Sequence, residues 1–300
     1  MRSYDRMKKE NTQTILDTHK RQKVYDDNDN NWHKVLIVSR CNIITGKKNR
    51  MAADDSYAET YNAFLRRDNC CEVFEETIRR FSRELNLPSV KSCLMIGPGE
   101  GRNEVPFIKQ CTRNISKVVA VEQDHSSTEG LRVRLDKDLP GVDCQVIESD
   151  IQGWKGPDDP VDLVLMMHVL YYLNTSERKE LFRKLEEHWL TTGGFAIVVS
   201  ASSAKRPGNA NEIFERMGTL RTAWEDVEAE LLEAGFIKTY AHEMQSTRDY
   251  SNPDGPLLRF LQSHIDHPVT LDDVRTAIEE LFPNGKPAQA FSTIAVFQRA

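Results

Sequence analysis

The stretch SCLMIGPGEGRNEV, residues 92–105, decides how this chain folds. An apolar run ends at Ile96, glycines follow at the alternate positions 97, 99 and 101, and a segment compatible with a helix comes next. Glycine permits positive φ and lets another molecule approach the backbone without meeting a Cβ. A loop that only turned the chain would need fewer glycines, so we expect a bound group at this loop.

More apolar runs follow, and helical patterns separate most of them. The runs lie at 92–96, 117–121, 144–148, 161–167 and 195–200, and the clearest helical pattern lies at 176–190. Strands with little polar interruption that alternate with helices predict a parallel sheet covered on both faces. Later patterns predict helices at 223–236, 255–265 and 270–282, and strands at 237–244 and 291–300 that form an antiparallel hairpin at one sheet edge.

The charge is unevenly distributed along the chain. Residues 1–52 carry 12 Lys and Arg against six Asp and Glu, a net +6, so with −6 overall the other residues sum to −12. An acidic main body argues against a nucleic-acid groove, which depends on clustered Lys and Arg. No apolar segment reaches the ~20 residues of a membrane helix, and no signal-peptide pattern is present. The six scattered cysteines form no CxxC pair or metal motif, which favours reduced thiols in a cytoplasmic protein.

Acidic residues stand at the ends of the next two predicted strands. Glu122, followed by Gln123, comes 21 residues after Gly101, where a carboxylate can accept hydrogen bonds from ribose hydroxyls. Asp150 closes the third strand and could accept a bond from an adenine amino group, with Ile151 packing on the ring. In isolation Asp150 reads equally well as a helix N-cap.

The fourth strand ends at Met167 and His168. A histidine has an ordinary pKa of ~6.5 and can take a proton near neutral pH. His168 is therefore a candidate base or substrate contact; the alternative is a neutral side chain bonded to backbone. The segment LTTGGFAIVVS, 190–200, is expected to be a Gly–Gly turn that leads into the fifth strand.

These pieces, in this order over about residues 90–200, resemble a class I S-adenosylmethionine-dependent methyltransferase. The resemblance implies an α/β Rossmann-like fold with a seven-stranded, mostly parallel sheet flanked by helices, and S-adenosyl-L-methionine as cofactor. No metal is expected. The cofactor contacts that it implies are Gly97, Pro98, Gly99, Gly101, Glu122, Gln123, Asp150, Ile151 and Met167.

A narrower resemblance, over about 57–300, is to histamine N-methyltransferase and its relatives. It rests on YAETYNAFLRR (57–67), DLVLMMHVLYYL (162–173), VVSASS (198–203), GPLLRFL (255–261) and the C-terminal FSTIAVFQRA. The resemblance implies that the helices predicted from Ser56, with a break near 68–69, form a lid. It also implies His168, Tyr171 and Tyr172 as catalytic-site residues and Tyr57, Tyr61, Phe214 and Phe291 as substrate contacts.

Positions that would hold histamine depart from that family. The sequence NCCE at 69–72 occupies the place of that family's lid glutamate. His168 corresponds to a glutamine of the family, and its asparagine on the last strand corresponds to about Phe291. The predicted acceptor is therefore a nitrogen of a small amine or imidazole-type molecule other than histamine. Aromatic walls such as Tyr171, Tyr172 and Phe291 could carry a cationic or imidazole-like group.

The predicted organisation is a poorly ordered polar leader (1–52) and a methyltransferase domain (53–300). That domain comprises a helical lid (53–88), a cofactor-binding core (89–200) and a substrate-side part with the C-terminal hairpin (201–300). The predicted enzyme is a cytoplasmic monomer that acts on a small molecule, with no nucleic-acid or membrane partner. Three alternatives stay open: an O-methyltransferase, a cofactor-binding relative without catalysis, and, disfavoured by the glycine spacing, an NAD-dependent oxidoreductase.

Overall fold

The computed structural model of the chain describes residues 57–84, 87, 89–203 and 205–300. The leader predicted over residues 1–52 lies outside the described residues, as do residues 53–56 at the start of the predicted domain. The division of the remainder into lid, core and substrate-side part stays a prediction.

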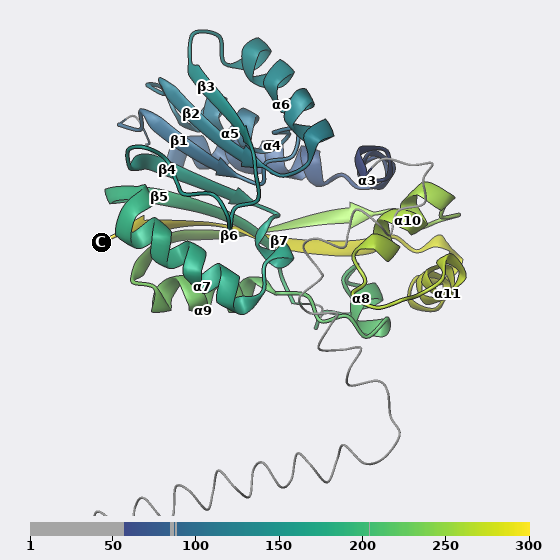
Figure 1. Cartoon of the computed structure of the whole chain (residues 1–300). Coiled ribbons are helices and arrows are strands. Elements are labelled where there is room, and N and C mark those ends of the chain that lie inside the picture. Colours follow the sequence, from purple (N-terminus) through teal and green to yellow (C-terminus); the bar gives the residue numbers. More distant parts are fainter. Residues whose placement is uncertain (1–56, 85–86, 88, 204) are drawn as a thin grey trace, which may run out of the picture. The chain divides into compact units, whose positions relative to one another are not determined.

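One seven-stranded sheet organises the described part of the chain (Figure 1). Its order is β3-β2-β1-β4-β5-β7-β6; β1 to β5 are parallel, and β7 is antiparallel to both of its neighbours. The predicted mostly parallel sheet with a C-terminal antiparallel hairpin is confirmed. The strands are β1 (Ser92–Ile96), β2 (Lys117–Glu122), β3 (Asp143–Glu148), β4 (Val161–Met167), β5 (Leu190–Ala201), β6 (Phe236–Arg248) and β7 (Ala288–Arg299).

Helices cover both faces of this sheet because its central strands are apolar on both sides. One face packs against α4, α5 and α6 through a core that includes Phe81, Phe107 and Leu135. The other packs against α7 and α9 through Phe182 and Trp224. These helices are α4 (Cys70–Glu84), α5 (Glu104–Cys111), α6 (His125–Asp138), α7 (Thr175–Lys184) and α9 (Trp224–Glu233).

A third apolar cluster gathers α3, α8, α10 and α11 beside the long β6–β7 hairpin (Figure 1). The Phe260 ring of α10 lies 4.4 Å from the Phe64 ring of α3, which ties the first described helix to the C-terminal part of the chain. The two helices predicted before the sheet are confirmed, because α3 ends at Leu65 and α4 begins at Cys70. The helices of this cluster are α3 (Tyr57–Leu65), α8 (Glu212–Arg216), α10 (Gly255–Ser263) and α11 (Leu271–Leu281).

The predicted Gly–Gly turn before the fifth strand is wrong. Gly193 and Gly194 lie inside β5, where Leu190 pairs with Val161 but Phe195 pairs with Leu163, so β5 carries extra residues as a bulge. Gly193 has a φ of 76°, the left-handed conformation that such a bulge requires. The helix predicted over 176–190 is α7 followed by a π-helical turn, η3 (Leu185–Trp189).

Candidate functional site

The loop after β1 has a backbone that favours glycine at three positions. Gly97, Gly99 and Gly101 have φ angles of 57°, 56° and 71°. A Cβ at Gly97 would lie 2.4 Å from Val169 Cγ2, and one at Gly101 would lie 2.6 Å from Leu131 Cδ1. A Cβ at Gly99 would meet no heavy atom within 4 Å. Close packing within the chain therefore explains the outer two glycines, whereas the space beside Gly99 is open to a ligand.

Glu122, the last residue of β2, turns its carboxylate towards this loop. Its Oε2 accepts a hydrogen bond from the Gly99 N–H at 2.9 Å, and its Oε1 accepts one from the Asp124 N–H at 2.9 Å. The residue is 8% exposed, and burial raises the pKa of the carboxyl group although both N–H donors oppose the rise. A carboxylate has about four acceptor positions, so Glu122 keeps capacity for ribose hydroxyls.

Glu104 is a second buried acid at this edge, and the sequence analysis missed it. It is the first residue of α5 and is 2% exposed. Burial, with a smaller contribution from the charge of Glu122, raises its pKa to about 8. An acidic residue in a first helical turn normally indicates an exposed position that favours the helix dipole. The sequence therefore gives no signal that this side chain points inward.

His168 follows β4 directly and has a strained backbone. Its φ is 57°, which is rare outside glycine, and its N–H donates to Val199 O at 2.8 Å, continuing the β4–β5 pairing. Burial, and then the charge of Arg221, lower the pKa of the imidazole to about 4. His168 is therefore neutral at pH 7 and can accept a hydrogen bond through one ring nitrogen.

A buried ion pair lies near this histidine. Arg248, the last residue of β6, contacts the Asp68 carboxylate at 2.6 Å, and its Nη1 donates to the Tyr250 hydroxyl at 3.3 Å. The Asp68 side chain is fully buried, and the charges of both partners act on the pKa of His168. Asp68 and Arg248 lie far apart in the sequence, so no local pattern could have paired them.

Arg221 lies beside two of the predicted aromatic residues. Its Cζ is 4.3 Å from the centroid of the Tyr171 ring and 4.5 Å from that of the buried Phe214 ring. Its charge also acts on His168 and Tyr250. Tyr171, Phe214, Arg221 and His168 therefore lie close together, although they come from three separate segments of the chain.

Tyr172 is fixed by a hydrogen bond to α10. Its hydroxyl lies 2.9 Å from Nε2 of His264, whose Nδ1 lies 2.8 Å from the carbonyl oxygen of Phe260. Because a carbonyl only accepts, Nδ1 carries the proton and Nε2 accepts from Tyr172. The bond couples η2 (Leu170–Tyr172), the turn after β4, to the helical cluster beyond the sheet.

The predicted lid also contacts the glycine loop. Arg102 Nη2 donates to Asn62 Oδ1 of α3 at 2.7 Å and pairs with Glu100 at 2.8 Å. Of the two tyrosines predicted on this helix, Tyr57 begins α3, and Tyr61 packs its ring 5.6 Å from Phe260. Arg102 therefore joins the lid helix to the loop that is open at Gly99.

Two cysteines begin α4, the second helix of the predicted lid. A hydrogen bond with the Cys70 thiol and the charge of Arg102 lower the pKa of the Cys71 thiol to about 7. All cysteines in the described part of the chain are free thiols.

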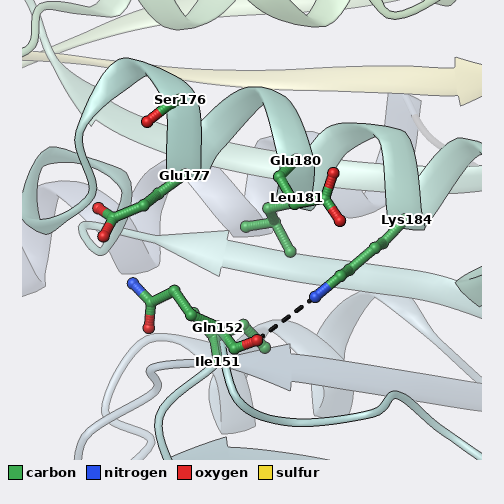
Figure 2. Close-up of a pocket in the computed structure, with 7 residues that line it drawn as sticks. All are labelled: Ile151, Gln152, Ser176, Glu177, Glu180, Leu181 and Lys184. Carbon is green, nitrogen blue, oxygen red and sulfur yellow. Dashed lines mark hydrogen bonds between the residues drawn. The ribbon is translucent and has the colours of Figure 1, made fainter.

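Of the two residues predicted after β3, Ile151 lines a pocket (Figure 2). Asp150 is exposed, and its Oδ1 accepts from the Gly153 N–H at 2.6 Å, which closes a turn. Ile151 is half-buried and lines a pocket of about 290 Å³ between this turn and α7, where Lys184 Nζ donates to Gln152 O at 3.4 Å. The other lining residues are Ser176, Glu177, Glu180 and Leu181.

The remaining predicted residues lie along the same sheet edge or beyond it. Pro98 is buried within the glycine loop, Gln123 is exposed after β2, and Met167 is buried at the end of β4. Phe291 of β7 is half-buried and stacks under Arg206 at 4.6 Å.

Two groups of residues thus meet at the carboxyl ends of the central strands: the glycine loop with Glu122, and His168 with Tyr171, Phe214 and Arg221. Val169 lies against Gly97 and connects them. The carboxyl edge of an open parallel sheet is where α/β proteins bind ligands. The open space beside Gly99 and the acceptor capacity of Glu122 fit the backbone approach and the ribose of a nucleoside cofactor such as S-adenosylmethionine.

Comparisons with known proteins find one family and several solved structures that are similar to this chain. The family described as "Methyltransferase domain" matches residues 93–194. Two solved structures share the fold with TM-scores of 0.52. A candidate methyltransferase of Bacillus halodurans is 15% identical, and the alignment covers 74% of this chain and 98% of that one. The YcgJ protein of Bacillus subtilis is 13% identical, and the alignment covers 74% of this chain and 97% of that one. The N-methyltransferase NodS of Bradyrhizobium japonicum, in complex with S-adenosyl-L-homocysteine, is 16% identical. Its alignment covers 75% of this chain and 87% of that one, with a TM-score of 0.46.

No curated protein matches the chain. Among the described helices, none is long and apolar enough to cross a membrane.

Proposed function

We propose that this chain is a class I S-adenosylmethionine-dependent methyltransferase and that it transfers the methyl group to a neutral nitrogen of a small imidazole-type or amine molecule. Its likeness to histamine N-methyltransferases, with an acceptor other than histamine, is part of this proposal. The observation that supports it is the position of His168, which lies directly before Val169, the residue that packs against Gly97, and whose imidazole pKa is lowered by burial.

The low pKa of His168 favours nitrogen over oxygen as the attacking atom. A phenol has an ordinary pKa of ~10, far above the lowered pKa of His168, so proton transfer from a phenol to this imidazole would be strongly uphill. An alkylammonium of pKa ~10 would cost about 4 kcal/mol to deprotonate at pH 7. An imidazole, with a pKa near ~6.5, is already mostly neutral at that pH and needs no base.

The residues of the chain then have defined tasks. Gly99 and Glu122 would hold the cofactor, which when bound supplies an electrophilic methyl group on a positively charged sulfur. His168 would accept a hydrogen bond from the N–H of the acceptor ring, which leaves the other ring nitrogen directed towards the methyl group. Tyr171 and Phe214 would form the apolar wall, and α3 would exclude water. Such positioning can contribute roughly 7–11 kcal/mol.

The test is a methyl-transfer assay with radiolabelled S-adenosylmethionine and three acceptors: 4-methylimidazole, butylamine and phenol. We expect transfer to the imidazole at pH 7, slower transfer to the amine, and none above background to phenol. His168→Gln should lower the rate without changing S-adenosylhomocysteine affinity. Preferred methylation of phenol would favour the O-methyltransferase alternative, and cofactor binding with no transfer to any acceptor would favour a non-catalytic relative.

A further inference from the structure

Three arginines near the site pair with carboxylates. Arg248 pairs with Asp68 at 2.6 Å, Arg102 with Glu100 at 2.8 Å, and Arg178 with Glu230 at 2.6 Å. Arg221, in contrast, has no carboxylate within ion-pair distance among the residues that the structure describes; its contacts there are the rings of Tyr171 and Phe214. A guanidinium stacked on aromatic faces keeps its N–H donors at the edge of its plane. Five donors are therefore available to a ligand.

We propose that Arg221 binds a carboxylate group of the methyl acceptor, so that the substrate is an anionic, carboxylate-bearing molecule. This inference rests on the proposed function, because Arg221 lies beside His168 and would hold the end of the acceptor opposite the reacting nitrogen. The charges of the group agree with a single negative charge: Arg221 and Arg248 are cationic, Asp68 compensates one of them, and His168 is neutral.

The geometry favours a carboxylate over other charged groups. The planar fork of an arginine matches a carboxylate with two parallel hydrogen bonds. A phosphate ester, with a charge of about −1.5 to −2, would exceed the single uncompensated cation. An ammonium group would be repelled by Arg221, and the Tyr171 and Phe214 rings that could have stacked on it already contact the guanidinium.

The test compares three imidazoles with side chains of similar size but different charge: the anionic imidazole-4-acetate, its neutral amide and the cationic imidazole-4-ethylamine. Binding of each to the full chain saturated with S-adenosylhomocysteine is measured by calorimetry. We expect the acetate to bind at least about 10-fold tighter than the amide, and the amide tighter than the amine, since hydrogen bonds between charged groups are the strong ones. Equal binding of acetate and amide, no binding of the acetate, or preference for the amine would overturn the proposal.

Variants of Arg221 locate the effect. Arg221→Gln should weaken acetate binding about 10- to 100-fold and amide binding less than about threefold. Arg221→Lys should give an intermediate loss because it keeps the charge but not the fork. Arg216→Gln removes one positive charge from an exposed pair with Glu280 and should bind all three ligands like the wild type. An equal loss in Arg216→Gln would contradict the assignment to Arg221.

A salt titration of the wild type keeps the test decisive if Arg221→Gln fails to fold. The acetate preference over the amide should decrease as ionic strength rises, and a salt-independent preference would count against Arg221. Methyl transfer to the same ligands separates the two proposals. Transfer to all three rings without acetate preference refutes only the role of Arg221, whereas Arg221-dependent acetate binding without transfer refutes only the proposed reaction.

Discussion

Gly99→Ala separates the two reasons for which a glycine can occupy a loop. The new Cβ would meet no protein atom within 4 Å, so the cost to the protein comes from the positive φ alone. That conformation costs a non-glycine residue about 1–2 kcal/mol, which lowers the Tm of a domain of this size by roughly 2–8 °C. If the cofactor lies against the backbone at Gly99, the alanine side chain also crowds the cofactor. This crowding would cost about 1–3 kcal/mol of binding free energy, or 5- to 150-fold in affinity.

Gly141→Ala is the matched control. Gly141 lies in the turn between α6 and β3 with a φ of 83°, and a Cβ there also meets nothing within 4 Å. Both variants should lose similar stability in thermal unfolding, but only Gly99→Ala should bind S-adenosylhomocysteine more weakly in calorimetry. If Gly99→Ala bound the ligand like the wild type, the glycine loop would not be the cofactor loop.

Three further predictions concern the acids and the histidine at the sheet edge. Glu122→Gln should weaken S-adenosylhomocysteine binding about 10-fold or more, because charge-assisted bonds are worth about 1.5–3 kcal/mol each; unchanged calorimetric affinity would exclude the ribose role. Glu104 has its pKa raised to about 8, so the folded state retains a proton that the unfolded state loses, and stability falls as pH rises from ~4.5 to about 8. In urea unfolding, Glu104→Gln should therefore gain stability over the wild type, on the order of 4 kcal/mol at pH 8 and little at pH 4.5. The pKa of His168 is lowered to about 4, so its contribution to folding stability is fully present above pH ~6.5 and is lost as the pH falls towards 4. The slope of this loss reaches about 1.4 kcal/mol per pH unit. His168→Gln should not show this loss.

The sequence predicted the framework well because local patterns encode it. β1 and β4 have the predicted bounds, and the glycines after β1 signal a backbone that other residues adopt at a cost. Apolar runs without polar interruption distinguish buried parallel strands, and helical spacing identified α3 and α4 with the break between them. The Gly193–Gly194 bulge was missed because a glycine pair indicates a turn and a bulge equally well.

The sequence could not predict the charged part of the site, because long-range contacts create it. Arg248 meets Asp68 only after β6 lies beside the segment between α3 and α4, and Arg221 meets Tyr171 only after the loop before α9 returns to the end of β4. Each is an ordinary polar residue in its own segment. The prediction of an amine or imidazole-type acceptor rested on the family resemblance and on the aromatic residues, and the contact of Arg221 with Tyr171 and Phe214 supports the proposed carboxylate on that acceptor.

The most direct test of methyl transfer to nitrogen follows the bond that forms. The full chain is incubated with S-adenosylmethionine carrying a ¹³C methyl group and with ¹⁵N-labelled imidazole-4-acetate, and the product is observed by NMR. A one-bond ¹³C–¹⁵N coupling in the product, absent without protein, is the predicted result. Methyl label on oxygen, or no product while S-adenosylhomocysteine binds normally, would contradict the account.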